Sequence, residues 1–186
     1  MTPPLRIIAG AWRGRAIASP GGATTRPSSI RVRQALFDIL LHASWAEEAV
    51  TGCRVLDVFA GSGALGFEAL SRGAEQVTFL ENDPAACAVI QHNIHTYGVA
   101  DRATVNICDA LSPPRGLPHP LALIDPPYGR GFVPRSIIAL GANGWIVPGT
   151  IIAAEFGRED PIPTNVSPLI ERVHGAARLV IWRHSS

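Results

Sequence analysis

From residue 53 onward, short apolar runs alternate with longer segments of mixed polarity. The short runs fit buried strands, which we expect at residues 54–59, 76–80, 104–107, 121–124 and 150–154. The longer segments fit helices at 63–72, 84–97 and around 137–142. Strands and helices that alternate in this way predict a parallel sheet with helices packed on its faces.

The last part of the chain has a different pattern. Residues 169–174 and 178–182 are both strand-like, and the short Gly175-Ala176-Ala177 segment between them predicts an antiparallel hairpin. We therefore expect an α/β, Rossmann-like fold with a mostly parallel seven-stranded sheet that ends in this hairpin.

The N-terminal residues look like an addition to that sheet. Apolar pieces at 5–9 and 16–18 flank a polar tip and predict a small hairpin or extended arm, followed by a loop at 20–27. Ser28 or Ser29 can then cap a helix. Its apolar face would contain Val32, Leu36, Phe37, Leu40 and Leu41, with Arg31 and Arg33 off that face. We expect two parts, an arm at 1–27 and a main domain at 28–186.

Composition narrows the class of protein. A chain of 186 residues with 47% hydrophobic residues is sufficient for one globular domain, and its three cysteines lack a metal or disulfide spacing, which favours reduced thiols in the cytoplasm. No uncharged stretch is continuous enough to predict a membrane span. The net charge is only +1, but six of the sixteen arginines precede the first acid, Asp38. The N-terminal region is therefore purely cationic.

A glycine-rich turn follows the first strand of the sheet. Gly61, Gly63 and Gly66 fit GxGxxG, and Glu81 ends the next strand twenty residues after Gly61, where an acid can bind ribose hydroxyls. This motif alone does not separate NAD from S-adenosylmethionine. Asp57 favours the latter, because a carboxylate inside the first strand needs a partner, and the amino group of a methionine moiety would supply one directly or through water. Backbone donors of the turn are the alternative partner.

The remaining donor contacts are expected at the ends of the next two strands, where Asp109 could accept from the adenine amine beside Asn82 and Ala110. The candidate donor site comprises Asp57, Phe59, Ala60, Gly61, Ser62, Gly63, Glu81, Asn82, Asp109 and Ala110. Together with the sheet pattern, it predicts a class I S-adenosylmethionine methyltransferase.

Asp125-Pro126-Pro127-Tyr128 follows the fourth strand, across the carboxyl edge of the sheet from the glycine turn. Prolines present rigid carbonyl acceptors without N–H donors, which suits an amine substrate. We expect the Asp125 carboxylate and the Pro126 carbonyl to accept the two N–H bonds of an exocyclic amine while Tyr128 stacks on its ring. Methyl transfer then requires mainly alignment of the amine with the donor.

Residues 6–15, Arg26-Pro27-Ser28-Ser29, 57–66 and 125–128 together resemble the RsmD family. This resemblance implies an enzyme that methylates guanine N2 in 16S ribosomal RNA, within the small ribosomal subunit or its assembly intermediate. We expect the enzyme to be a cytoplasmic monomer. The resemblance also implies RNA contacts by Arg6, Trp12, Arg13, Arg15, Arg26, Ser28, Ser29, Arg31 and Arg33. Trp12 could stack on a base, although packing on the domain is the favoured interpretation.

Other functions fit parts of the pattern. A similar tetrad can serve amino-methyltransferases that act on DNA adenine, tRNA or a protein glutamine. The glycine turn alone also fits an NAD-dependent reductase, and a non-catalytic RNA-binding factor could retain the fold. His92 and His95 lie three residues apart on one expected helix, but no further ligands complete a metal site, so we expect no metal.

Overall fold

The computed structural model describes residues 4–22, 27–46 and 49–185. Its seven-stranded sheet has the order β3-β2-β1-β4-β5-β7-β6. The strands are β1 (Arg54–Val58), β2 (Gln76–Glu81), β3 (Ala103–Ile107), β4 (Leu121–Ile124), β5 (Ile151–Gly157), β6 (Ile170–His174) and β7 (Ala177–Arg183). The pairings among β1 to β5 are parallel, whereas β7 is antiparallel to both β5 and β6. The sheet and its closing hairpin confirm the predicted fold class.

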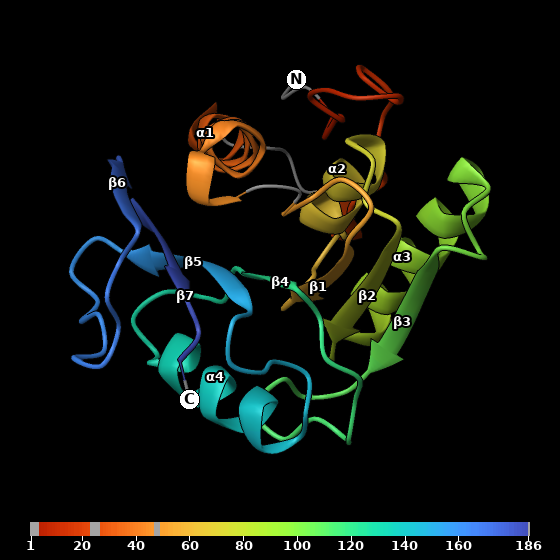
Figure 1. Cartoon of the computed structure of the whole chain (residues 1–186). Coiled ribbons are helices and arrows are strands. Elements are labelled where there is room, and N and C mark those ends of the chain that lie inside the picture. Colours follow the sequence, from red (N-terminus) through yellow and green to blue (C-terminus); the bar gives the residue numbers. More distant parts are fainter. Residues whose placement is uncertain (1–3, 23–26, 47–48, 186) are drawn as a thin grey trace.

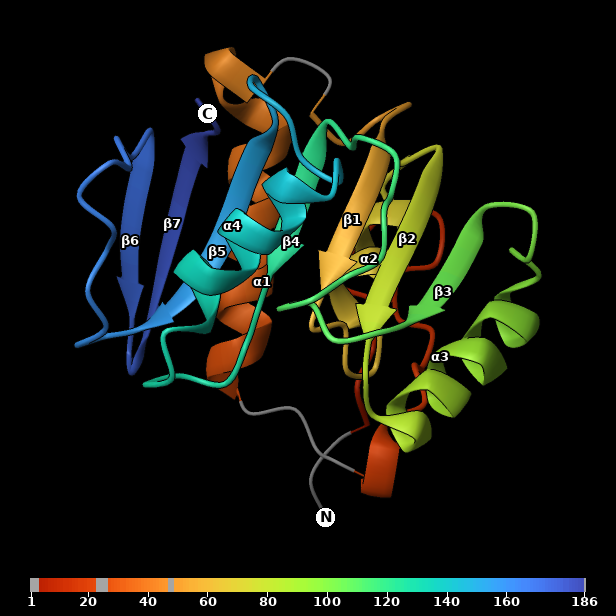
Figure 2. The same ribbon diagram turned by 90° about the horizontal axis from the view of Figure 1, so that it is seen from below.

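Helices cover both faces of this sheet (Figures 1 and 2). The helices are α1 (Pro27–His42), α2 (Ala64–Ser71), α3 (Pro84–Tyr97) and α4 (Phe132–Ala142), with short 3-10 turns η1 (Pro20–Gly22) and η2 (Ser44–Ala46). The apolar residues of α1, α2 and α3 join one core cluster, and those of α4 join the other. In Figure 1, α1 and α2 accordingly lie on the opposite side of the sheet from α4.

The strands supply both cores by alternation, because successive side chains point to opposite faces of a sheet. On β1, Val55 belongs to the core under α1 to α3, whereas Leu56 and Val58 belong to the core under α4. Asp57 falls on the first of these faces, paired in register with Phe79 of β2 and Leu123 of β4. Its carboxylate is therefore directed to the side of the sheet that α2 covers.

Three helix predictions need correction. Helix α1 begins at Pro27, so Ser28 and Ser29 lie inside its first turn and neither is the N-cap. Leu41 is 36% exposed, because it lies nine residues after Val32, about half a turn around the helix from it. Helix α4 begins at Phe132, before the expected start around Ile137, with Gly131 as a left-handed N-cap. Pro134 does not prevent this start, because proline is tolerated in the first turn of a helix.

The N-terminal arm forms the predicted hairpin. The N–H of Ile7 donates to the Arg15 carbonyl (3.0 Å), and Arg6 pairs antiparallel with Ala16. Leu5, Ile7 and Ile17 are buried in the same core cluster as Phe67 of α2. The arm therefore shares the hydrophobic core of the main sheet.

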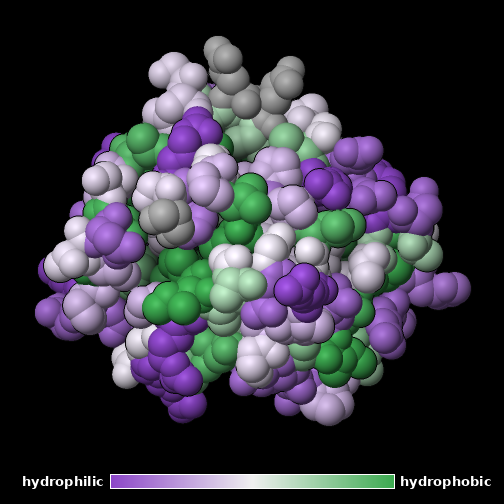
Figure 3. Space-filling view, turned by 60° about the horizontal axis from the view of Figure 1, so that its bottom comes forward, coloured by the Kyte–Doolittle hydropathy of each residue, from purple (hydrophilic) through white to green (hydrophobic). Residues whose placement is uncertain are grey.

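The longest helix in the described part of the chain, α1, has 16 residues. No helix in this part is long and apolar enough to cross a bilayer. On the face shown in Figure 3, apolar and hydrophilic residues are interspersed.

Candidate active site

A cavity of about 690 Å³ opens at the carboxyl edge of the parallel strands, the edge at which open α/β sheets bind ligands. It joins five predicted donor-site residues to the complete tetrad that follows β4. The lining residues are Phe59, Gly61, Glu81, Asn82, Asp109, Leu111, Asp125, Pro126, Pro127, Tyr128, Arg130 and Phe132. Residues from four strand ends thus meet in one space.

The glycine turn between β1 and α2 has an unusual backbone conformation. Phe59 has a φ of 60°, which is costly for a bulky residue, and Gly61 and Gly63 have φ values of 56° and 77°. Gly66 is required for a different reason, because a Cβ at this position would lie 2.3 Å from the Phe79 ring. The turn therefore needs these glycines for backbone conformation and for close packing of α2 on β2.

Glu81 is held at the end of β2 by backbone donors. Its Oε2 accepts from Gly61 N (2.7 Å), and its Oε1 accepts from Asn82 N and Asp83 N (both 2.9 Å). These bonds fix the carboxylate at the cavity wall and tie the glycine turn to the start of α3. A carboxylate has about four acceptor positions, so capacity remains for ribose hydroxyls.

Asp57 has the alternative partner considered from the sequence. Its Oδ2 accepts a hydrogen bond from Gly66 N (2.8 Å), the residue is 1% exposed, and it does not line the cavity. The sequence does not reveal this partner, because Gly66 N is brought to β1 only when α2 folds over the strand. In the structure, Asp57 fixes the first turn of α2 from inside the core.

Three acids nevertheless make this edge electronegative. Burial raises the pKa of Asp57 well above its usual value, and the Gly66 hydrogen bond opposes that rise. The charges of Asp125 and Glu81 raise the pKa of Asp57 further. Within the described residues, no ion pair involves any of these three acids. The site thus fits a cationic ligand such as a sulfonium with an ammonium group.

The other predicted donor residues divide into two groups. Asp109 lines the cavity and accepts a hydrogen bond from Leu111 N (2.9 Å), and Asn82 lines it beside Glu81. Four others are not among the residues that line the cavity, namely Ala60, Ser62, Gly63 and Ala110. Ala110 is 3% exposed and packs in the core under α4, so it supports the wall from behind.

In the tetrad, Asp125 lines the cavity and is exposed there. Desolvation by neighbouring protein atoms, together with the charge of Glu155, raises the pKa of Asp125 to about 7. Tyr128 is 42% exposed, and its hydroxyl donates to Glu155 Oε1. The tetrad therefore presents a titratable acceptor beside an accessible aromatic ring.

Several residues of the site were not predicted. The Phe132 ring stacks on Phe59, with centroids 5.9 Å apart and planes at 8°, and Arg130 and Leu111 complete the lining. Glu155 was missed because β5 was expected to end at residue 154, whereas it continues to Gly157. An acid directly after an apolar run, as at Asp125, was the available signal.

The arm is anchored on α2 by buried polar groups. Glu68 is 0% exposed and accepts from Ile8 N (2.8 Å) and Ala9 N (3.0 Å). Ser71 Oγ accepts from Trp12 N (3.0 Å) and donates to Ala9 O (2.6 Å). These bonds hold the arm on the helix that begins at the glycine turn.

Arg33 requires a correction, because it was expected to be free for solvent or RNA. It is 6% exposed, lies 3.9 Å from Glu68 and donates to the Arg6 carbonyl (2.8 Å). At roughly 100° per residue, position 33 falls inside the apolar stripe of α1, between Leu40 and Phe37. Arg33 is thus a buried cation held by Glu68 and the Arg6 carbonyl, and the expected exposure is wrong.

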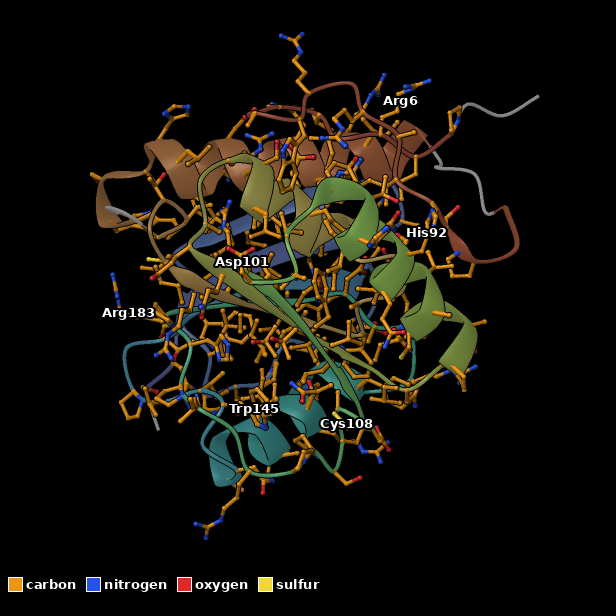
Figure 4. All side chains as sticks on the ribbon, turned by 90° about the vertical axis from the view of Figure 1, so that its right-hand side faces the viewer. Arg6, His92, Asp101, Cys108, Trp145 and Arg183 are labelled. Atoms are coloured by element: carbon orange, nitrogen blue, oxygen red, sulfur yellow. The ribbon has the colours of Figure 1, made fainter. Side chains whose placement is uncertain are left out.

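The three arginines in the described part of the arm, Arg6, Arg13 and Arg15, are exposed, and two of them make local contacts. Arg6 donates to the Gly14 carbonyl (2.7 Å), and Arg15 lies over the Tyr97 ring at 4.2 Å. Arg31, on α1, is also exposed. Figure 4 shows Arg6 on the α1 side of the molecule, away from Trp145 beside α4.

Trp12 packs on the domain, as favoured from the sequence. Its ring centroid lies 4.7 Å from that of Tyr97, and the residue packs against the core cluster. Arg26 lies outside the described residues, as do the side chains of Ser28 and Ser29. His92 and His95 are exposed, and the described residues contain no group of three or more metal-ligating side chains.

The sheet order, the glycine turn and the cavity define the class of protein, a class I S-adenosylmethionine methyltransferase. A model of the family described as Conserved hypothetical protein 95 matches residues 5–183. The chain belongs to this family, which is the RsmD family that its motifs resemble.

Similar proteins agree with this assignment. The chain is 38% identical to ribosomal RNA small subunit methyltransferase D of Escherichia coli, over 98% of this chain and 91% of the relative. It is 35% identical to the protein of the same name from Haemophilus influenzae, over 97% and 94%. Among solved structures, a putative methyltransferase from Escherichia coli, yhhF, superposes with a TM-score of 0.83 at 35% identity, covering 99% of both chains.

Proposed function

We propose that this chain transfers the methyl group of S-adenosylmethionine to the exocyclic N2 amine of a guanine in 16S ribosomal RNA. The observation that carries the proposal is the single cavity shared by the donor-site residues and the tetrad. Family membership supports it, since relatives of similar length are named as small-subunit ribosomal RNA methyltransferases. When bound, the donor supplies an activated methyl group on a sulfonium.

The residues at the donor end fit that cofactor. Glu81 is positioned for ribose hydroxyls, and Asp109 and Asn82 can receive the adenine. The Phe59–Phe132 pair adds an aromatic wall that can pack on a ring. The three acids at this edge favour binding of the positively charged donor. After transfer the product has lost the sulfonium charge, so the acids bind it less strongly.

At the acceptor end, the tetrad performs alignment and charge stabilisation. The Asp125 carboxylate and the Pro126 carbonyl accept the N2–H bonds, and Tyr128 stacks on the base. The N2 lone pair attacks the methyl carbon, so a C–N bond forms as the S–C bond breaks. The positive charge that develops on nitrogen is stabilised by Asp125, and the extra proton leaves to solvent after transfer.

The arm supports an RNA partner. Arg6, Arg13, Arg15 and Arg31 are exposed, and Figure 4 shows Arg6 on the side of the sheet that carries α1. In Figure 2 the start of α1 and η1 lie at the edge toward which β1 and β2 point, so RNA held there can reach the cavity. Arg26, Ser28 and Ser29 belong to the same proposed surface by resemblance. The proposed partner is the small subunit or its assembly intermediate, with the enzyme acting as a cytoplasmic monomer.

The decisive experiment is methyl transfer from labelled S-adenosylmethionine to naked 16S rRNA and to small subunits from a strain that lacks the modification. The proposal predicts label at the N2 of one guanine, found by mapping the methylated nucleotide. Label on adenine, tRNA or protein would contradict the proposed substrate. Absence of label from every acceptor in single-turnover conditions would indicate a non-catalytic RNA-binding factor.

Asp125→Ala separates chemistry from donor binding. Because Asp125 is proposed to contact the amine, turnover should be abolished while affinity for S-adenosylhomocysteine stays within severalfold, as measured by isothermal titration. NADH in the same titration should give no binding. A large loss of S-adenosylhomocysteine affinity would show that Asp125 belongs to the donor site.

A further inference from the structure

A second cavity, of about 190 Å³, adjoins the first on the side of β5. The two cavities share Pro126, Pro127, Tyr128 and Phe132, which form their common wall, whereas Asp125 lines the larger cavity only. Glu155 lines the smaller cavity only. A base whose exocyclic amine reaches the tetrad would therefore place the neighbouring atoms of its Watson–Crick edge near Glu155.

Glu155 has a fixed position in this wall. It lies on β5 in register with Leu179 of β7, and its Oε1 accepts the hydrogen bond of the Tyr128 hydroxyl. The Asp160 carboxylate accepts hydrogen bonds from Gly129 N (3.1 Å), next to Tyr128 in the chain, and from Gly157 N (2.9 Å), two residues after Glu155. Tyr128 and Glu155 are thus held together from both ends, and the orientation of the carboxylate is set in advance.

Two carboxylates at this site are electrostatically unfavourable in the absence of a ligand. Burial raises the pKa of Glu155, while the Tyr128 hydrogen bond and the charge of His174 lower it. The Glu155 charge in turn raises the pKa of Asp125. Such a pair is stabilised by a ligand that brings several N–H donors at once, whereas a lone amine would require one acceptor group.

Guanine presents that arrangement of donors. Its Watson–Crick edge carries N1–H next to the N2 amine, whereas adenine has a bare N1 acceptor at the corresponding position. A carboxylate accepts hydrogen bonds only and repels an acceptor lone pair. Since a flipped base is read by hydrogen bonds to its Watson–Crick edge, an acid beside the tetrad selects guanine.

We propose that Glu155 determines specificity by accepting the N1–H of the target guanine, while Asp125 and the Pro126 carbonyl accept the N2–H bonds. This inference rests on the proposed function. Glu155 therefore has two roles, to hold the Tyr128 hydroxyl and to distinguish guanine from bases that lack a hydrogen on N1.

The test uses a base that keeps the reacting amine but has no hydrogen on N1; it also lacks O6, so the comparison with a Glu155 variant isolates the N1 contact. The probe is 16S rRNA with 2-aminopurine at the methylated position, which retains the 2-amino group but has an acceptor at N1. The wild-type enzyme should methylate guanine with a kcat/KM roughly 10- to 100-fold higher than 2-aminopurine. Equal kcat/KM values on the two substrates would overturn the proposal.

Glu155→Gln should reverse part of this preference, because the amide can donate to a bare N1. The guanine to 2-aminopurine ratio of kcat/KM should fall by roughly 10- to 100-fold, through a loss on guanine and a gain on 2-aminopurine. Glu159→Gln is the matched control, since the Glu159 side chain is 95% exposed and outside both cavities. It should leave the ratio unchanged.

Tyr128→Phe distinguishes recognition of the base from positioning of Tyr128. It removes the hydroxyl that Glu155 holds and keeps the ring and the carboxylate, so it should lower kcat/KM on guanine and on 2-aminopurine by the same factor. If Glu155→Gln also lowers the two kcat/KM values equally, Glu155 acts only through Tyr128 and the proposal is wrong. If the wild-type enzyme methylates no guanine in rRNA, the proposed function itself fails and this inference fails with it.

Discussion

The rate of methyl transfer should depend on pH through Asp125, whose pKa is raised to about 7 by desolvation and by the Glu155 charge. The carboxylate accepts an N–H bond and stabilises positive charge on nitrogen only when it is ionised. The active form of the free enzyme therefore predominates above pH 7. Asp125→Asn replaces this titrating acceptor with an amide oxygen that accepts a hydrogen bond at every pH.

The expected change in kcat/KM with pH follows from the titration of Asp125. With a pKa of about 7, roughly a tenth of the wild-type enzyme has an ionised Asp125 at pH 6, and roughly nine tenths at pH 8. The wild-type kcat/KM should thus rise about tenfold over this interval. The Asn variant should be slower at pH 8, by on the order of 10- to 30-fold, because a neutral acceptor makes a weaker bond than a charged one. At pH 6 the two enzymes should be of similar activity.

The measurement is kcat/KM for methyl transfer between about pH 5.5 and 8.5 at constant ionic strength, since this quantity reports pKa values of the free enzyme. Glu155→Gln provides an independent check, because removal of the Glu155 charge should move the wild-type inflection to lower pH. A wild-type profile that is flat between pH 6 and 8 would refute the reasoning. An inflection near pH 7 that persists in Asp125→Asn would assign it to another group.

Two further substitutions test the attachment of the arm, and one pH series tests how Asp125 affects the stability of the protein. Gly10→Ala should lower the free energy of unfolding by about 2–4 kcal/mol, because its φ is +82° and a Cβ would lie 1.9 Å from Ser71 O. Gly14→Ala, with φ +81° and nothing within 4 Å, is its control and should cost only the backbone strain, on the order of 1–2 kcal/mol. Urea unfolding measures both losses, and equal losses would contradict the contact with Ser71. Glu68→Gln should cost about 3–5 kcal/mol, since Arg33 and Arg72 lose the buried charge that compensates them, and the exposed Glu159→Gln serves as control. The pKa of Asp125 in the folded state lies above its unfolded value of about 3.9, so ionisation of Asp125 destabilises the wild-type protein as pH rises from about 4 to 7. Asp125→Asn has no such ionisation, so its Tm relative to wild type should increase over that range. A constant difference in Tm would argue against the raised pKa.

The acids that line the cavity could be predicted because they share a local signal. Glu81, Asp109 and Asp125 each lie at or just after the end of a strand, and parallel strands bring their carboxyl ends to one edge. The partners of these acids could not be predicted in the same way. The Gly66 N–H that binds Asp57 depends on how α2 packs on β1, which no local pattern encodes.

The arm shows a different limit of sequence reasoning. Its clustered arginines were visible in the sequence, but their exposure was not, and Arg33 is buried because Glu68 compensates its charge from a helix 35 residues later. Burial lowers the pKa of Arg33, and the Glu68 charge opposes that change. A charged residue in an apolar stripe therefore indicates a buried partner as readily as a free cation.

One short helix, α2, contacts both the glycine turn of the donor site and the N-terminal arm. The first turn of α2 holds Asp57 through Gly66 N, and its last turn holds the arm through Glu68 and Ser71. Asn93 of α3 makes a parallel link, because its side-chain amide donates to Ala18 O (3.0 Å) and to Ser62 O (3.4 Å). The arm and the donor turn are thus attached to the same two helices. RNA bound by the exposed arginines would therefore meet a surface whose position relative to the donor cavity is set by buried hydrogen bonds, which is the alignment that in-line methyl transfer requires.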